Sequence, residues 1–216
     1  MKGDYSKLAN QIISQIKFEV DQIDQLLKSY TELLEKTKKS EPNLVEITAI
    51  ASVLHSFYNG VENIFLSIAK GIDEHLPEGI QWHRDLLIQM TQQNPKRNRV
   101  ITEEMTQKLV EYLGFRHFYR HSYSFFLEWD ELKKLVNPIQ DIWTDLKKEL
   151  FEFIDSISSC WNENIEKTKW TLMSNFMQTK AGVEIATEHI FEGIINCFLN
   201  SESSGFILDK ISTFLR

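Results

Sequence analysis

The chain has 216 residues, of which 42% are hydrophobic and 25% are charged, and these fractions are those of an ordinary globular protein. They exclude a disordered or collagen-like chain, and 8 glycines and 4 prolines are too few for a β-sandwich or barrel with its frequent turns. The formal net charge of −7 argues against a protein that coats nucleic acid. The two cysteines, Cys160 and Cys197, form neither a disulfide framework nor a zinc motif.

The first part of the chain predicts two long helices. Apolar residues recur every three or four positions over residues 7–37, which is the period of one buried helical face. Pro42 follows this pattern and ends the first helix. Asn43 and Glu46 then form the sequence pattern of a capping box, which opens a second helix through about Gly71. We expect these two helices to pack as an antiparallel pair.

The remaining expected helices are separated by recognisable breaks. Leu76–Gly79 is a turn, Thr102 is a good N-cap, Gly114 ends one helix, and Pro138 kinks another. These signals predict helices over residues 82–92, 103–114, 115–126 and 130–157.

No window alternates polar and apolar residues for long enough to predict a strand. The sequence therefore predicts an all-α fold, a bundle of four to five helices with additional C-terminal helices. Residues 1–158 form the expected helical domain and residues 159–216 a helical extension of unknown role. The start of the chain lacks the apolar core of a signal peptide and no apolar run is long enough to span a bilayer, so we expect a cytoplasmic protein without membrane association.

The arginines are concentrated in one window of the sequence. Between residues 84 and 120, seven basic side chains stand against four acidic ones, a net charge of +3, so the rest of the chain carries −10. Arginine is the preferred side chain for bidentate contacts to phosphate, and its clustering in an acidic protein indicates a phosphate-bearing ligand. A solvated loop and helix face is the alternative interpretation. The arginines of this window are Arg84, Arg97, Arg99, Arg116 and Arg120.

The densest polar and aromatic stretch covers residues 115–123. His117 and His121 are four residues apart, but no Asp, Glu or Cys in the stretch completes a metal site. Acid–base chemistry on a phosphodiester fits better, because histidine titrates near neutrality and arginine stabilises charge on phosphoryl oxygens. Together these groups allow metal-free attack of an RNA 2′-hydroxyl on its own phosphate. Histidines that hydrogen-bond inside a helical bundle are the structural alternative.

Helix geometry limits how Arg116 and His121 can meet. At about 100° per residue, Arg116 shares a face with Arg120 and Tyr123, whereas His121 lies about 140° around the helix from Arg116. Two arrangements would bring them together. Either a helix begins near Gly114, so that Arg116 lies in a frayed first turn, or two copies of the helix meet across a twofold axis. The second arrangement also accounts for the many aromatic residues of this stretch.

The spacing Arg116-x4-His121-x-Tyr123 resembles the R-x4-H-x-Y signature of the HEPN superfamily, and in particular that of the HepT-like ribonuclease toxins of bacterial toxin–antitoxin pairs. Other segments occur in a similar order and spacing, and the resemblance covers about residues 5–157. These segments are Leu54–Glu62, Leu76–Gly79, Trp82-His83 and Leu127–Asp130.

The resemblance implies a homodimer whose R-x4-H elements line one cleft, acting without cofactor or metal as an endoribonuclease on RNA, tRNA in some members. It also implies a minimal nucleotidyltransferase (MNT) antitoxin as partner, which in some pairs transfers AMP from ATP onto the tyrosine of the motif. Carried over by position, Arg116 stabilises the phosphate, His121 is the acid–base group and Tyr123 is the AMPylation site. The alternative function is a non-catalytic nucleotide- or RNA-binding helical subunit of a nucleotidyltransferase complex.

Further side chains are candidates for lining such a cleft or for contacting the RNA backbone. For those on the second helix, packing or interhelical hydrogen bonding is the commoner role. Trp82 and Trp129 are expected to be core or interface anchors. The candidates are Arg120 and His117 in the motif, Lys96, Arg97 and Arg99 in the preceding loop, and His55, Tyr58 and Glu62 on the second helix.

Overall fold

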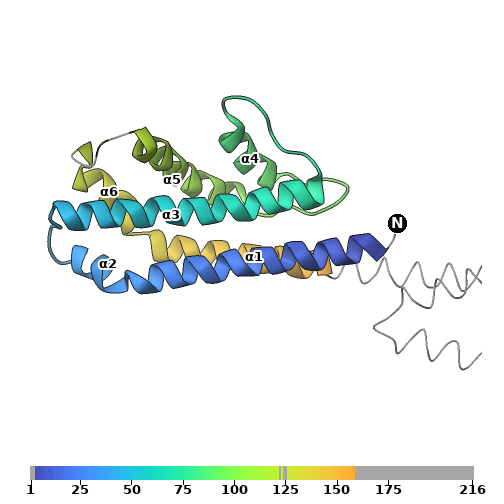
Figure 1. Cartoon of the computed structure of the whole chain (residues 1–216), viewed down its shortest axis with the longest axis horizontal. Helices are drawn as coiled ribbons and strands as arrows, with labels where there is room; N and C mark the ends of the chain where they lie inside the picture. The colour runs from blue at the N-terminus through green and yellow to red at the C-terminus, as the bar shows by residue number, and fades with distance from the viewer. Residues whose placement is uncertain (1–2, 122, 124–125, 159–216) are drawn as a thin grey trace, which may run out of the picture. The chain divides into compact units, whose positions relative to one another are not determined.

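The computed structural model describes residues 3–121, 123 and 126–158, and those from Tyr5 onward belong to one compact unit. Within these residues the chain is helical and has no β-strand, which confirms the predicted all-α fold. The central element is α3 (Leu44–Ile68). On one of its sides lie α4 (Trp82–Thr91), α5 (Glu103–His121) and α6 (Trp129–Val136), and on the other side lies α1 (Gly3–Ser29) (Figure 1).

The first expected helix is divided into two. After α1 ends at Ser29, α2 covers Thr31–Thr37, and Tyr30 between them has φ −108° and ψ 12°, outside helical geometry. The prediction of one helix over residues 7–37 was therefore wrong at this point. Apolar periodicity continues on both sides of the break and so does not reveal it. The buried side chains keep that period throughout: Ile12, Ile16, Val20, Ile23, Leu27 and Leu34.

The capping box that opens α3 is confirmed. The Asn43 side chain accepts a hydrogen bond from the Glu46 backbone N–H at 3.0 Å, and the Glu46 carboxylate accepts one from the Asn43 backbone N–H at 3.0 Å. At its far end α3 continues into one wide π-helical turn, η1 (Ala69–Asp73). Gly60 of α3 lets α1 approach closely, because a Cβ at this position would lie 2.7 Å from the Ile23 side chain.

The structure corrects the prediction of two helices over residues 103–114 and 115–126, because α5 is one helix that continues through Gly114 to His121. Thr102 caps it as predicted, accepting a hydrogen bond from the Met105 N–H at 3.1 Å. Glycine lowers helix stability by about 1 kcal/mol relative to alanine, and the packing of Leu113 and Arg116 on either side outweighs this loss. A frayed helix start at Gly114 therefore does not explain how Arg116 reaches His121.

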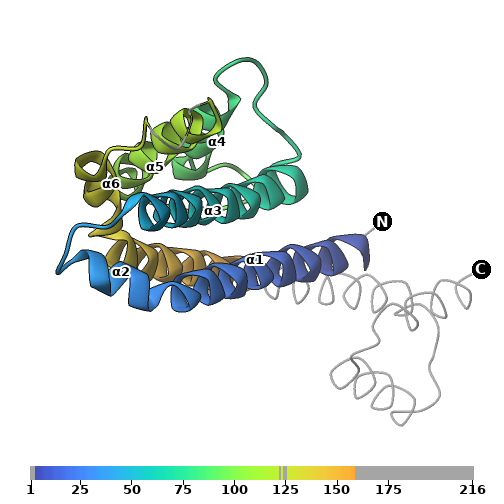
Figure 2. The ribbon, with the colours of Figure 1, turned by 60° about the vertical axis from the view of Figure 1, so that its left-hand side comes forward.

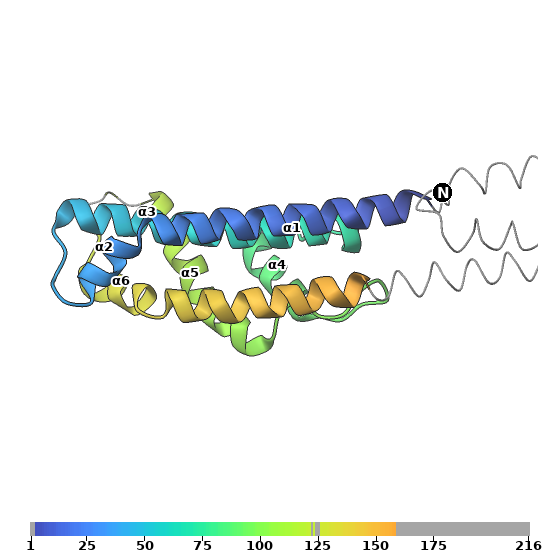
Figure 3. The same cartoon turned by 90° about the horizontal axis from the view of Figure 1, so that it is seen from below.

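The helix expected over residues 130–157 is also divided. α6 ends at Val136, a turn at Asn137 and Pro138 follows, and residues 139–158 form a separate helix beside α1 (Figure 3). Pro138 lacks the N–H that would continue the hydrogen bonding of α6. Asp24 of α1 accepts hydrogen bonds from Trp143 at 2.6 Å and from Lys147 at 2.7 Å, which ties the two helices together.

The expected extension over residues 159–216 lies outside the described residues, so the division at residue 158 stays a prediction. Among the residues that the structure describes, no helix is both long enough and apolar enough to cross a membrane.

Candidate functional site

Helix α5 places Arg116 on its buried face. Met105, Leu109, Tyr112 and Arg116 follow one another at intervals of four, three and four residues, so they form one stripe along the helix. This stripe faces α3, and only 8% of the Arg116 surface is exposed. The sequence prediction grouped Arg116 with Arg120, but the structure buries the first and exposes the second.

The guanidinium of Arg116 is held by two residues of α3. Its Nε–H donates to Asn59 Oδ1 at 2.7 Å, and its Nη2 forms an ion pair with Glu62 Oε2 at 2.8 Å. The side chains of Arg116 and Glu62 are 9% and 6% exposed, so this is a buried ion pair. A buried charge is tolerated only when it is paired and hydrogen-bonded, and both partners here meet that condition.

His83, near the start of α4, completes the cluster. Its Nδ1 lies 2.5 Å from Glu62 Oε1, and both of its ring nitrogens lie 3.4–3.5 Å from Arg116 Nη1. Trp82 stacks on the His83 ring at a centroid distance of 3.5 Å, and His117 of α5 meets the ring edge-on at 5.2 Å. The half-buried Trp82 therefore contacts the cluster. We refer below to Asn59, Glu62, His83 and Arg116 as the Arg116 cluster.

Sequence reasoning missed two members of this cluster. Asn59 was not a candidate, although it lies three residues before Glu62 and so shares its helix face. His83 entered the sequence analysis only within the segment Trp82-His83 of the family resemblance, and no local pattern connects it with Glu62. Asn59 and His83 come together with Arg116 only through the packing of α3, α4 and α5, whose arrangement is shown in Figure 2.

Two histidines border the cluster and have lowered pKa values. His55 contacts Asn59 Nδ2 at 3.1 Å and packs against Tyr119 at 5.0 Å between ring centroids. Desolvation lowers its pKa, and the positive charges of Arg116 and Arg120 lower it further. The pKa of His117 is lowered first by desolvation and then by His83 and Arg116. Lowered pKa values favour the neutral imidazole, which is the form that accepts a proton.

Tyr58 has a packing role. It is 1% exposed, and burial together with the Glu62 carboxylate raises the pKa of its phenol. Of the three candidates on α3, Glu62 and His55 therefore contact residues of the motif, whereas Tyr58 belongs to the core.

Within one chain the structure does not join Arg116 to His121. His121 is the exposed last residue of α5, and no contact connects it with Arg116 in the described part of the chain. Arg120 is exposed on the same last turn, and Tyr123 follows the helix with 72% of its surface exposed. Phe118 and Phe126 are also exposed here, at 45% and 58%. The end of α5 is therefore a basic and aromatic surface.

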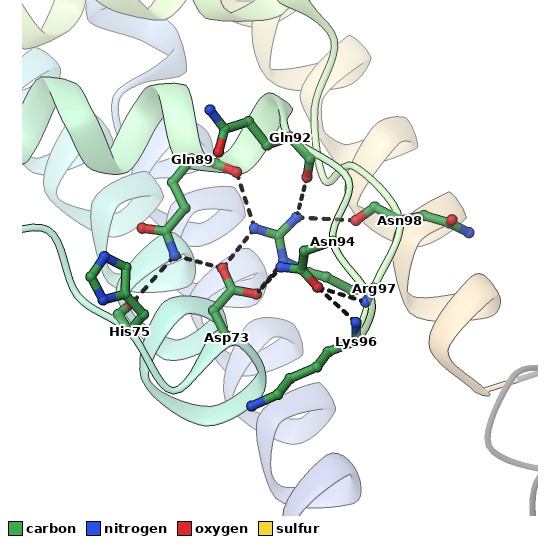
Figure 4. Close-up of polar contacts among 8 residues, drawn as sticks. All are labelled: Asp73, His75, Gln89, Gln92, Asn94, Lys96, Arg97 and Asn98. Atoms are coloured by element: carbon green, nitrogen blue, oxygen red, sulfur yellow. Dashed lines mark hydrogen bonds and ion pairs between the residues drawn. The ribbon is translucent and has the colours of Figure 1, made fainter.

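The structure corrects the candidate role of Arg97. Its Nε and Nη2 bind the two carboxylate oxygens of Asp73, each at 2.7 Å, and its other N–H groups donate to backbone carbonyls (Figure 4). Arginine has five N–H donors, and all five have acceptors here. The side chain has no donor left for an RNA phosphate, so Arg97 is a structural residue. The accepting carbonyls belong to Gln89, Gln92 and Asn98.

Asp73 in turn is held as a carboxylate. Burial alone would raise its pKa, but hydrogen bonds from Arg97, Asn94 and Gln89 outweigh burial and lower the pKa below the ordinary value. These bonds tie the loop after α4 to η1. On an ideal helix the eleven residues from Glu62 to Asp73 span about 16 Å, so this loop is remote from the Arg116 cluster.

The other two candidates of this loop, Lys96 and Arg99, are exposed, and neither contacts Arg116 in the described part of the chain. Lys96 forms an ion pair with Glu74 at 2.8 Å. Arg99 lines a cavity of about 420 Å³ together with Glu149 and Glu152, whose carboxylates disfavour a phosphate. A second cavity of about 300 Å³ lies between α1 and α3. Among the described residues no three His, Cys, Asp or Glu side chains gather as a metal site would require.

Comparison with known proteins places the chain in a family. The sequence model of the family described as HepT-like protein matches residues 49–157, which is half of the chain and contains the whole Arg116 cluster, His121 and Tyr123. The chain belongs to the HepT-like protein family. No curated protein matches the sequence, and no solved structure matches it.

HepT-like proteins are a family of HEPN ribonuclease toxins, so membership suggests a toxin-type protein with nuclease activity in a toxin–antitoxin setting. The family match and the all-α fold agree with the resemblance expected from the R-x4-H-x-Y spacing. In this HepT-like chain the arginine of the spacing is buried and the histidine is exposed.

Proposed function

We propose that this HepT-like protein is a metal-independent endoribonuclease toxin in which Arg116 and His121 act together in a cleft between two copies of the chain. The observation that carries the proposal is that Arg116 is buried and that Asn59 and Glu62 hold its guanidinium in one orientation. A buried, oriented arginine on the R-x4-H spacing borders two histidines with lowered pKa values and a basic, aromatic helix end. Such a surface suits a single phosphodiester better than nonspecific coating of RNA, in keeping with the net charge of −7.

The proposed reaction is transesterification within the RNA. A histidine takes the proton of a 2′-hydroxyl, the 2′-oxygen forms a bond to the adjacent phosphorus, and the bond from phosphorus to the 5′-oxygen breaks. A second histidine gives its proton to the leaving 5′-oxygen. The products are a 2′,3′-cyclic phosphate and a 5′-hydroxyl. Arg116 stabilises the negative charge that develops on the non-bridging oxygens.

In the proposed dimer, two copies of the chain bring Arg116 and His121 to one cleft, which a single copy does not do. Because α5 is a single helix, His121 lies about 140° around the axis from Arg116. A twofold axis beside the end of α5 would place His121 of each copy toward the cleft and bury the exposed Phe118 and Phe126. It would also supply two histidines, one to accept a proton and one to donate it.

The proposed partner is an MNT-type nucleotidyltransferase antitoxin that AMPylates Tyr123. The exposure of Tyr123, two residues beyond His121, supports this assignment because a transferase must reach its hydroxyl. The added adenylyl group would carry a negative charge and considerable volume into the proposed cleft, and both oppose the binding of an RNA phosphate.

The experiment that tests this function is RNA cleavage by the purified protein in EDTA. We expect 2′,3′-cyclic phosphate ends from the wild type and no cleavage from Arg116→Ala or His121→Ala. Arg84→Ala is the matched control, because Arg84 is an exposed arginine of the same sequence window. Cleavage by His121→Ala at the wild-type rate would remove His121 from the mechanism, and absence of cleavage by the wild type would overturn the proposed function.

One observation favours the second candidate, a non-catalytic RNA- or nucleotide-binding subunit. The Glu62 carboxylate already neutralises Arg116, which weakens the stabilisation that this arginine can give to the charge developing on a phosphate during cleavage. The two functions differ in cells. A ribonuclease toxin arrests growth when expressed alone and loses this effect with Arg116→Ala, whereas a binding subunit is harmless in both forms.

A further inference from the structure

We propose that Glu62, which is held by a hydrogen bond from His83, is the positioning residue that orients Arg116 toward the scissile phosphate. This inference rests on the proposed ribonuclease function and adds residues of α3 and α4 to the R-x4-H spacing. The structure supplies three independent arguments for it: the way the guanidinium is fixed, the donors that it keeps, and the contacts that hold Glu62.

The first argument is that two acceptors on α3 fix the plane of the guanidinium. Asn59 binds Nε–H and Glu62 binds Nη2, so two points of a rigid planar group are held by one helix. A long arginine side chain otherwise loses considerable conformational freedom when it binds a ligand. Orientation in advance of binding reduces this loss and places the group for the transition state.

The second argument comes from a comparison of the two buried arginines. Arg97 uses all five N–H donors within the chain and is closed to any ligand. Arg116 donates Nε–H to Asn59 Oδ1 and forms an ion pair with Glu62 through Nη2, and it has no other oxygen partner among the described residues. The pairing with Glu62 thus holds Arg116 while leaving N–H groups on Nη1 and Nη2 for a phosphate.

The third argument is that Glu62 is itself held from the other side. Its second oxygen, Oε1, accepts a hydrogen bond from His83 Nδ1. Arg116 Nη1 lies almost equally far from the two nitrogens of the His83 ring, at 3.4 and 3.5 Å. An in-plane hydrogen bond to either nitrogen would leave the other much more distant, so His83 does not bind Arg116 through a ring lone pair. Its strong contact is the one to Glu62.

Trp82 in turn supports His83, because the two rings stack with their centroids 3.5 Å apart. The contacts run in order from Trp82 to His83, Glu62 and Arg116. Glu62 is 5% exposed and both of its oxygens are engaged, so it acts through Arg116 and does not itself contact substrate.

The first test follows Arg116 directly. In ¹⁵N-detected NMR spectra of the full chain, the Nε–H signal of Arg116 should exchange with water about tenfold faster in Glu62→Gln than in the wild type, because protection depends on the local hydrogen-bonded structure. The Arg97 Nε–H signal is an internal control and should not change. Unchanged exchange at Arg116 would overturn the proposal.

The second test separates positioning from stability in the cleavage reaction. Per folded molecule, Glu62→Gln should lower kcat by about 100-fold with little change in KM, the result expected when an interaction that acts in the transition state is lost. Asp73→Asn is the matched control, since it removes the carboxylate partner of the other buried arginine. A wild-type kcat for Glu62→Gln, or an equal fall for Asp73→Asn, would contradict a positioning role.

Conservative variants test the same contacts with a smaller change. His83→Asn keeps an amide donor near the position of Nδ1 and should retain most of kcat, whereas His83→Leu should lower it. Glu62→Asp keeps the carboxylate and should recover part of the loss, and these three variants decide the question if Glu62→Gln does not fold. If the wild type cuts no RNA, the proposed function fails. The exchange rate of Arg116 then still shows whether Glu62 holds it.

Discussion

The Glu62 carboxylate on α3 and the Arg116 guanidinium on α5 form a buried ion pair 2.8 Å long. The pair joins the two helices within the part of the chain that the family model matches. Removal of either partner leaves an uncompensated charge in the bundle, so structural and functional effects of mutations here are coupled. Substitutions away from this pair, at Arg97, Gly114 and Gly60, should change the stability of the fold without altering the pair itself.

The contacts of Arg97 predict a large structural contribution and no direct contact with RNA. Arg97→Met should lower the free energy of unfolding by about 3–5 kcal/mol, because it leaves the buried carboxylate of Asp73 without its partner. Urea unfolding monitored by circular dichroism measures this change. Lys96→Met is the neighbouring control and should shift the free energy by less than about 1 kcal/mol, since the Lys96–Glu74 pair is exposed. Equal effects of the two substitutions would contradict the assignment.

Gly114 offers a stabilising substitution. It lies inside α5 with helical backbone, and a Cβ added there would have no heavy atom within 4 Å in the described residues. Gly114→Ala should therefore raise the free energy of unfolding by about 1 kcal/mol, the usual difference in helix propensity. A rise in the urea midpoint with an unchanged slope would show it. A variant less stable than the wild type would indicate that a second copy approaches α5 at this position.

Gly60 should respond in the opposite way to the same change. A Cβ at Gly60 would lie 2.7 and 2.8 Å from two carbons of the Ile23 side chain, so this side chain, or α1 with it, would have to move. Gly60→Ala should lower the free energy of unfolding by about 1–3 kcal/mol, as overpacking of a core does. The comparison with Gly114→Ala in the same denaturation assay removes effects of alanine itself, and a stabilised Gly60→Ala would contradict the close packing of α1 on α3.

The lowered pKa values of His55 and His117 predict a loss of stability toward acid. Below the ordinary histidine pKa of about 6.5, the unfolded chain binds protons that the folded chain does not yet bind. The free energy of unfolding should therefore fall as the pH decreases from about 6.5 toward the folded values. NMR titration should give midpoints below about 6.5 for both rings. The decrease should be smaller in a His55→Gln/His117→Gln variant, and midpoints at or above the ordinary value would contradict the prediction.

Tyr123 provides the test of the proposed partner. After incubation with the proposed MNT-type nucleotidyltransferase partner and with ATP, the intact mass should increase by one or more AMP units. Tyr123→Phe should abolish the increase, whereas Tyr119→Phe, which changes a half-buried tyrosine of α5, should not. An increase that persists in Tyr123→Phe would assign the modification to another residue.

The sequence predicted elements that depend on neighbouring residues. The capping box of Asn43 and Glu46 and the N-cap at Thr102 were correct, because each is complete within four residues. Breaks inside a regular pattern were less predictable. Tyr30 interrupts a helix whose apolar period continues, and Gly114 does not interrupt one, since packing on both sides outweighs the preference of a single residue.

By itself, the sequence determined the helical class, the caps at Asn43 and Thr102, and the resemblance to HepT-like proteins that the family match confirms. Only the tertiary structure decided what the arginines do. Arg97 and Arg116 look alike in a window of positive charge. Asp73 and three backbone carbonyls accept all five N–H donors of Arg97, whereas Glu62 and Asn59 hold Arg116 and leave it further donors. Their carboxylate partners lie on other elements of the chain. A local charge count therefore could not distinguish a structural arginine from one that is oriented for a ligand.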